Sequence, residues 1–258
     1  MDILIRNIGD ELGPEKILLL HQPQVGLEAI VVVDNPACGP AIGGVRMAPD
    51  VSVEEVYRLA RAMSFKNAAA GLPHGGGKAG IIAAPAASQQ EKERLIRTFA
   101  RLIDNLTDYI PGPDMGLNEE SMAWIHDETG RAVGLPRVLG GIPLDEIGAT
   151  GLGLAVAAEV AAPVVGIDLA GARVAVQGFG AVGQHVARFL RERGARLVAA
   201  ADSRGAVYNP QGLHVDLLIE HKRSGASVVT FSGGHPIDPN RLVSVDCEIW
   251  VPAARPDV

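Results

Sequence analysis

Hydrophobic residues recur along this chain in continuous runs and in helical spacing, and each pattern predicts a type of secondary structure. Residues 27–33 are almost wholly apolar and end at a turn signal, Asp-Asn-Pro, as expected of a buried strand. Shorter apolar runs at 78–82, 174–177 and 197–201 predict three further buried strands.

Apolar residues spaced three or four apart predict helices. Capping boxes that begin at Ser52 and Ser88 mark the starts of two amphipathic helices, and the second pattern continues to residue 110 before Pro-Gly-Pro ends it. Asn118 is expected to cap a short helix through residue 125, and small residues predict another over 150–165.

Segments rich in glycine and proline separate these elements. Residues 38–47 are expected to form a glycine-rich bend that carries a single arginine. Residues 134–147 form the best candidate for a linker. We therefore predict two α/β domains, over 1–145 and 146–258.

Composition narrows the class of protein. The chain has 258 residues, 47% of them hydrophobic and 21% charged, with a net charge of −7, which excludes a disordered protein and argues against nucleic acid as a partner. Cys38 and Cys247 make no disulfide framework, and without a CxxC pair no metal is expected. With no signal-peptide core or membrane-spanning run, a reduced cytoplasmic location is expected.

Two lysines lie in unusually apolar surroundings. Lys66 follows Met63 by three positions and is expected on the apolar side of its helix, and Lys78 follows three glycines at the start of a buried run. Burial disfavours the charged form of lysine, so such a group can exchange protons near neutral pH. Asp114, held between prolines and Gly116, is a candidate positioned carboxylate. From the residues alone, a snorkelling lysine, a loop lysine and an ordinary turn aspartate remain alternatives.

The second half carries a dinucleotide-binding pattern. A strand, a glycine-rich turn, a helix and a second strand ending in an acid occupy residues 172–202. The residues expected to contact the cofactor there are Gly178, Phe179, Gly180, Ala181, Val182, Gly183, Asp202 and Ser203. The glycines admit pyrophosphate to the helix N-terminus, and Asp202 would accept the ribose hydroxyls. Asp202 and Gly183 favour NAD, whereas Arg204 could pair with the 2′-phosphate of NADP.

Five motifs in order resemble the glutamate/leucine/phenylalanine/valine dehydrogenase family. They are GPAIGGVRM (39–47), MSFKNAAAGLPHGGGKAG (63–80), PGPDMG (111–116), GATG (148–151) and VQGFGAVG (176–183). The resemblance runs from about residue 36 to the end. It implies an N-terminal α/β substrate and oligomerisation domain followed by a Rossmann domain, and a homo-oligomer built through the first domain.

The resemblance also implies roles for individual residues. Lys66 would bind the substrate α-carboxylate, Lys78 would assist attack of water on the imino intermediate, and Asp114 would carry protons to and from the amino group. Thr150 would lie near the nicotinamide. Gly43, Gly44 and Met63 would line the substrate pocket. The implied reaction converts an L-amino acid, NAD(P)+ and water into a 2-oxo acid, ammonium and NAD(P)H.

Ile42 bears on the choice of amino acid. Members of the family that bind glutamate resemble GPYKGG at this point, with a lysine for the side-chain carboxylate, whereas this chain has GPAIGG. An unpaired carboxylate in an apolar pocket is costly, so an apolar substrate is favoured. Glutamate is the alternative, because PGPDMG and QGFGAVG resemble the glutamate-specific branch.

The C-terminal end departs from the family pattern. The chain stops just after a predicted strand, where family members continue with further strands and helices. We therefore expect an incomplete Rossmann domain with an exposed sheet edge. A non-catalytic dinucleotide-binding or assembly subunit, or an inactive fragment, is accordingly the alternative to an active enzyme.

Overall fold

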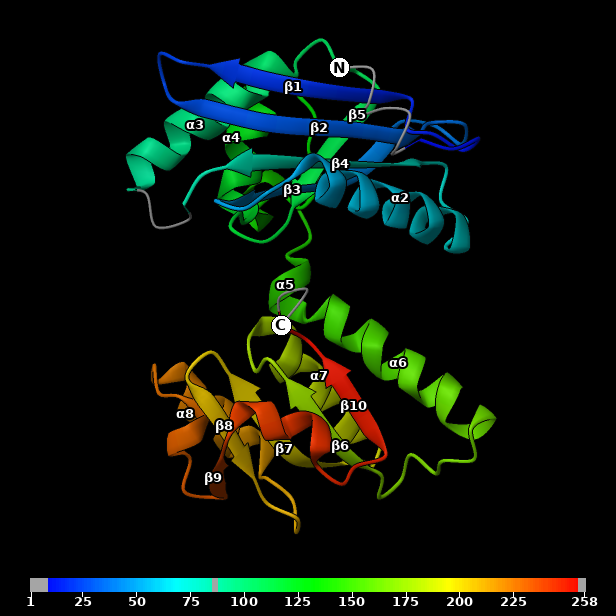
Figure 1. Ribbon diagram of the computed structural model, residues 1–258, viewed down its shortest axis with the longest axis vertical. Coiled ribbons are helices and arrows are strands. Elements are labelled where there is room, and N and C mark those ends of the chain that lie inside the picture. The colour runs from blue at the N-terminus through cyan, green and yellow to red at the C-terminus, as the bar shows by residue number, and fades with distance from the viewer. Residues whose placement is uncertain (1–8, 85–87, 255–258) are drawn as a thin grey trace. The chain divides into compact units, whose positions relative to one another are not determined.

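The computed structural model describes residues 9–84 and 88–254, and the chain forms two compact units (Figure 1). The first unit extends to Pro143 and the second begins at Leu144. Each unit has its own sheet and its own hydrophobic core.

The sheet of the first unit has the order β1-β2-β4-β3-β5. Its strands are β1 (Lys16–Gln22), β2 (Leu27–Asn35), β3 (Ala41–Ala48), β4 (Gly75–Ile82) and β5 (Tyr109–Pro113). β1, β2 and β4 pair antiparallel, whereas β3 runs parallel to both β4 and β5. The apolar runs that predicted β2 and β4 lie in central strands, where both faces of the sheet are buried.

Helices cover both faces of this sheet (Figure 1). One face packs against α2 (Val53–Ala69), and the other packs against α3 (Gln89–Leu102) and α4 (Glu119–Thr129). Glycine in β4 allows α2 to lie close to the sheet, because a Cβ on Gly76 would stand 2.1 Å from the backbone nitrogen of Ser64.

Two segments differ from the prediction. The helix expected to continue to residue 110 ends at Leu102, and Tyr109–Pro113 form strand β5 instead. The glycine-rich segment expected to bend is strand β3. Glycines and prolines conceal both strands, and β5 tolerates its prolines because it lies at the sheet edge.

The sheet of the second unit has the order β10-β6-β7-β8-β9. Its strands are β6 (Arg173–Gln177), β7 (Arg196–Asp202), β8 (Gly205–Tyr208), β9 (His235–Ile237) and β10 (Ile249–Pro252). β10, β6 and β7 are parallel, and β8 and β9 add antiparallel. The α-helices of this unit are α5 (Leu144–Ile147), α6 (Ala149–Val164), α7 (Ala181–Glu192) and α8 (Val215–Arg223).

The two faces of this sheet are covered unequally. One face packs against α6, α7 and α8 through a large apolar cluster. The other presents small residues, Ala175, Ala199 and Ala201, to Leu242 of a 3-10 segment, Pro239–Ser244. Among the described residues, no helix combines the length and apolar character needed to cross a membrane.

Candidate active site

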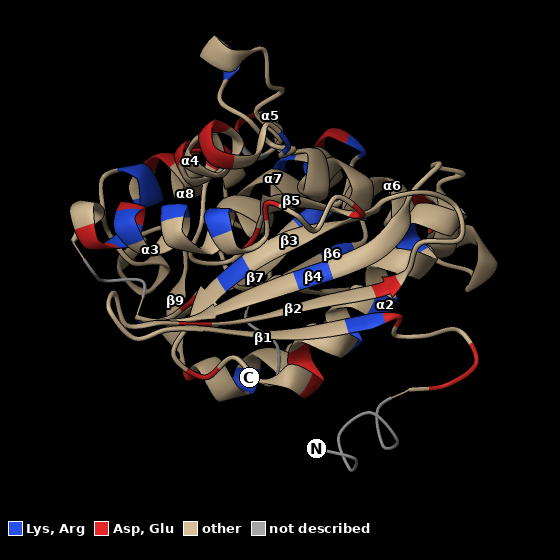
Figure 2. Cartoon of the chain, turned by 90° about the horizontal axis from the view of Figure 1, so that it is seen from above, with Lys and Arg blue, Asp and Glu red and all other residues tan. Residues whose placement is uncertain are grey.

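Three neighbouring strands of the first unit bring together a lysine, an arginine and an aspartate. Lys78 lies in the middle of β4, Arg46 lies in the parallel strand β3, and Asp114 follows β5 directly. Figure 2 shows a basic position in each of the neighbouring strands β3 and β4, and strand pairing places Arg46 opposite Gly80. Strand pairing aligns Val45 with both Ala79 and Pro113, so Lys78 lies one residue before this level and Arg46 and Asp114 lie one residue after it.

A single oxygen of the Asp114 carboxylate accepts hydrogen bonds from both cationic side chains. Lys78 Nζ lies 2.7 Å from Asp114 Oδ2, and Arg46 Nε donates to the same atom at 3.0 Å. Arg46 in turn pairs with Glu55 through Nη1. Lys78 and Arg46 are only 6% and 7% exposed, so these two cations are shielded from solvent, whereas Asp114 and Glu55 are partly exposed.

Burial and charge shift the pKa values of the central pair in a direction that suits proton transfer. Burial lowers the pKa of Lys78, and the positive charges of Arg46 and Lys66 add to this, while Asp114 opposes it. Burial alone would raise the pKa of Asp114, but Lys78 and Arg46 outweigh burial and the pKa is lowered. Asp114 is therefore held in its ionised form, beside an amine whose pKa is lowered.

Two glycines in β3 leave room for the Lys78–Asp114 pair. A Cβ on Gly44 would stand 2.7 Å from the Cβ of Asp114 and 3.1 Å from Lys78 Nζ, so any side chain there would displace the pair. A Cβ on Gly43 would lie 1.5 Å from the carbonyl oxygen of Gly77. The two glycines are therefore required by the site and by the pairing of β3 with β4.

The other residues predicted to bind substrate lie on β3 and α2. Ile42 is half-buried in β3, and Met63 is half-buried on α2. Lys66 lies in the last turn of α2 but is exposed, so its expected place on the apolar side of the helix is wrong. The buried stripe of α2 ends at Asn67, whose amide donates to the carbonyl oxygen of Gly75 at 2.7 Å.

Arg46 and Glu55 are members of this cluster that sequence reasoning missed. The available signal was a lone arginine in an otherwise apolar, glycine-rich segment. Glu55 was assigned to a capping box with Ser52, and half of that box forms, because the Glu55 nitrogen donates to Ser52 Oγ at 3.2 Å. The Glu55 carboxylate turns to Arg46 instead.

The second unit contains a glycine turn suited to a phosphate group. α7 begins after Gly180 with no side-chain cap, so its first N–H groups point outward without a side-chain acceptor. A Cβ on Gly180 would meet nothing within 4 Å, whereas one on Gly183 would lie 2.0 Å from the carbonyl oxygen of Gly178. Gly178 itself has φ +95°, which favours glycine. These features fit a dinucleotide pyrophosphate.

Three further residues predicted to contact the cofactor are not part of this turn, although Ala201, next to Asp202, accepts hydrogen bonds from the backbone nitrogens of Gly178 and Phe179. Asp202 ends β7, and its carboxylate is already hydrogen-bonded within the unit, to Lys222 among others. Ser203 is exposed just after it, and Thr150 is exposed in the first turn of α6. The proposed contacts of all three with a nucleotide remain predictions.

Comparison with known proteins now identifies the family. Residues 140–258 match the model of the "Glutamate/Leucine/Phenylalanine/Valine dehydrogenase" family, and residues 14–131 match its "Glu/Leu/Phe/Val dehydrogenase, dimerisation domain". The chain belongs to this family. The N-terminal assembly domain and the partial Rossmann domain predicted from sequence are confirmed.

The relatives include several glutamate dehydrogenases. The chain is 43% identical to that of Thermotoga maritima over 237 residues, which are 86% of this chain and 57% of that protein. A hetero-hexameric glutamate dehydrogenase from Thermus thermophilus, solved with leucine bound, matches at 35% identity and TM-score 0.82, covering 94% of this chain and 62% of that one. L-Tryptophan dehydrogenase from Nostoc punctiforme matches at 29% identity and TM-score 0.57, with 95% and 65% covered. The chain thus spans less than two thirds of its relatives' length.

Proposed function

We propose that this protein catalyses the oxidative deamination of an L-amino acid to a 2-oxo acid and ammonium, with NAD or NADP as the oxidant. The observation that carries the proposal is the buried contact of 2.7 Å between Lys78 Nζ and Asp114 Oδ2. A purely structural ion pair gains little from such burial, because desolvation offsets the attraction. An acid–base pair, in contrast, needs a shifted pKa of this kind.

Each side chain then has a distinct task. Lys66, exposed at the end of α2, would pair with the substrate α-carboxylate. Asp114, held ionised, would take the proton of the substrate ammonium group. Lys78 would accept a proton from the water that attacks the imino carbon, which its lowered pKa favours. The nicotinamide cofactor, when bound, supplies the hydride acceptor.

The favoured substrate has an apolar side chain. Ile42 stands on β3 next to Gly43 and Gly44 and offers no partner for a side-chain carboxylate. Glutamate is the alternative, and it is supported by relatives such as the Thermotoga maritima enzyme.

A second candidate function is that of a non-catalytic nucleotide-binding or assembly subunit. The chain covers 57% of its Thermotoga maritima relative, so the activity of the whole protein is itself part of the proposal. The retained Lys78, Asp114 and Lys66 favour the enzyme, since a subunit that only binds or assembles would not require all three.

The test is reduction of NAD and of NADP by the protein in the presence of leucine, valine, phenylalanine or glutamate, each assayed separately. We expect turnover with the apolar amino acids, and we expect Ile42→Lys to shift the preference towards glutamate. Turnover on glutamate alone would overturn the substrate assignment. Binding of nucleotide without turnover on any of the four would favour the non-catalytic subunit.

A further inference from the structure

The carboxylate of Asp202, at the end of β7, is saturated by donors from its own unit. Oδ1 accepts from the backbone nitrogen of Arg204 at 2.9 Å and from Ser227 Oγ at 2.8 Å. Oδ2 accepts from Lys222 Nζ at 2.6 Å and from the backbone nitrogen of Val228 at 3.0 Å. A carboxylate has about four lone-pair positions, so none is left for a ribose hydroxyl.

Asp202 is also electrically neutralised. Its side chain is only 9% exposed and that of Lys222 only 15%, so solvent screens their ion pair weakly. Burial alone would raise the pKa of Asp202, but the hydrogen bonds from Lys222 and the neighbouring backbone hold that pKa far below its ordinary value. The carboxylate is therefore a fixed anchor between β7 and the end of α8.

Positive charge prevails where the ribose of a bound nucleotide would lie. The charges of Asp202 and Lys222 cancel, and the exposed Arg204 adds one positive charge. Arg204 Nη2 donates to the carbonyl oxygen of Gly225 at 2.9 Å, which fixes one side of its guanidinium group. The exposed hydroxyl of Ser203 lies beside it in sequence.

We propose that Lys222 withdraws Asp202 from nucleotide selection, so that this site prefers NADP(H) and Arg204 pairs with the 2′-phosphate. In Rossmann domains an acid at this position favours NAD by accepting the ribose 2′-hydroxyl, whereas an arginine accommodates the 2′-phosphate. A saturated and neutralised acid loses that function. The inference rests on the proposed dinucleotide site, but not on turnover.

The test is equilibrium binding of NADPH and NADH, followed by the fluorescence of the bound reduced nicotinamide and without amino acid. We expect NADPH to bind about tenfold more tightly than NADH, because charge-assisted hydrogen bonds to a phosphate are strong. NADH binding equally well or more tightly would overturn the inference. Failure of both nucleotides to bind would overturn the dinucleotide site itself, and the inference with it.

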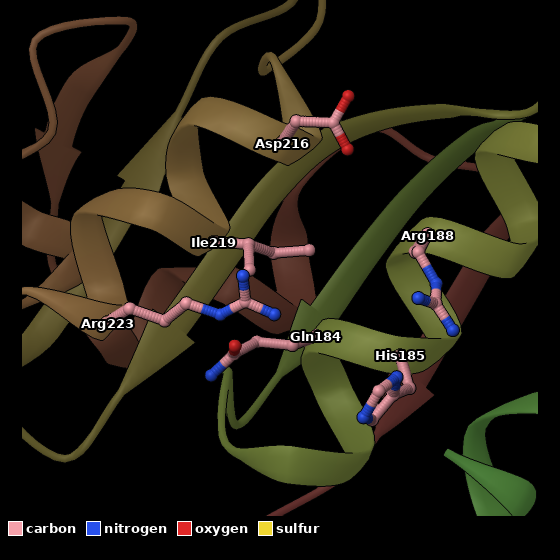
Figure 3. A pocket seen from close by; sticks show the side chains of 6 residues that line it. All are labelled: Gln184, His185, Arg188, Asp216, Ile219 and Arg223. Atoms are coloured by element: carbon pink, nitrogen blue, oxygen red, sulfur yellow. The ribbon is translucent and has the colours of Figure 1, made fainter. Parts of the chain in front are cut away.

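Arginine variants test the partner of the phosphate. Arg204→Ala should weaken NADPH about tenfold and NADH less than about twofold. The matched control is Arg223→Ala: Arg223 is also exposed, but it lines a cavity of ≈ 220 Å³ between α7 and α8 with Gln184 and Ile219 (Figure 3). That control should leave the ratio of the two affinities unchanged. An unchanged ratio in Arg204→Ala would contradict the assignment of Arg204.

Lysine variants test the neutralisation of Asp202. Lys222→Met frees a negative charge beside the 2′-phosphate and should shift the ratio of affinities towards NADH by about tenfold or more. Lys222→Arg keeps the charge and should retain the preference for NADPH. If a thermal melt shows that Lys222→Met is not folded, the comparison of Arg204→Ala with Arg223→Ala decides whether the preference for NADPH depends on Arg204. A folded Lys222→Met with the wild-type ratio would overturn the role of Lys222.

Discussion

At the scale of single residues, the site depends on one oxygen atom that two cations share. Asp114 Oδ2 receives Lys78 at 2.7 Å and Arg46 at 3.0 Å. Arg46 is held from its other side by Glu55. The arrangement fixes the orientation of the Asp114 carboxylate, because a rotation would break both contacts at once. Arg46 is thus a positioning residue for the proposed acid–base pair.

Replacement of Arg46 tests this role through the pKa of Lys78. The charge of Arg46 lowers that pKa, so Arg46→Met should raise it, and chemical acylation of Lys78 should then require higher pH. The labelling rate of Lys78 against pH, followed by peptide mass spectrometry, measures the shift without turnover. Arg58→Met, which removes an exposed arginine of α2, is the control. Identical labelling profiles for the two variants would contradict an electrostatic role for Arg46.

Sequence reasoning located the residues that belong to compact motifs and missed those that depend on strand pairing. Lys78 and Asp114 were found because each lies in an unusual local context. Arg46 and Glu55 meet only after β3 has joined the sheet and α2 has packed against it. The saturation of Asp202 was equally hidden, because Lys222 is 20 residues away in the sequence.

At the scale of elements, continuous apolar runs located the central strands correctly, whereas helical spacing extended one helix too far. The central strands β2 and β4 were predicted from their apolar runs. β5 was taken for the end of a helix, because Ile110 continues the spacing of α3 by coincidence. Tyr109 shows what decides its true place: it is buried, and its hydroxyl donates to the carbonyl oxygen of Gly43 at 2.9 Å.

The N-terminus of α7 provides a test of the nucleotide site. Gly180 faces open space, so Gly180→Ala should leave thermal stability nearly unchanged but weaken nucleotide binding at least about tenfold by filling the approach to the helix end. Gly153→Ala, on the exposed face of α6, is the control. It should add about 0.5–1 kcal/mol of stability and leave nucleotide affinity unchanged. Unaltered affinity in Gly180→Ala would argue against pyrophosphate at this turn.

Strand β10 is joined to β6 by an ion pair that acid should weaken. Glu248 accepts from the Arg173 backbone at 2.6 Å, and Arg173 lowers the pKa of Glu248 from 4.5 to about 2. Because the pKa of Glu248 is lower in the folded state, its ionised carboxylate stabilises the fold above pH 4.5. This stabilisation is lost as the pH falls towards about 2. Glu248→Gln should therefore melt below wild type at neutral pH, with a difference that narrows across this range. A constant difference would contradict the linkage.

At the scale of the whole molecule, the first unit is expected to assemble with a second copy. Residues 14–131 match a dimerisation domain. Edge strand β1 exposes 65% of Leu19, which lines an apolar hollow with Ile30, Val53 and Ile82. Light scattering should therefore give at least twice the chain mass of 26.9 kDa. Leu19→Lys should reduce that mass, whereas Leu217→Lys, on α8, should not. A monomer at micromolar concentration would contradict the prediction.

The most direct test of the account compares Lys78→Ala with wild type, measuring amino-acid-dependent nucleotide reduction and nucleotide affinity on the same preparations. Lys78 belongs to the first unit and the glycine turn to the second. We therefore expect a fall of at least about 100-fold in kcat with nucleotide affinity unchanged, since a positioned acid–base group supplies about that much. Lys92→Ala, on α3, controls for the loss of a lysine. Wild-type turnover in Lys78→Ala would show that Lys78 is not the proposed proton acceptor.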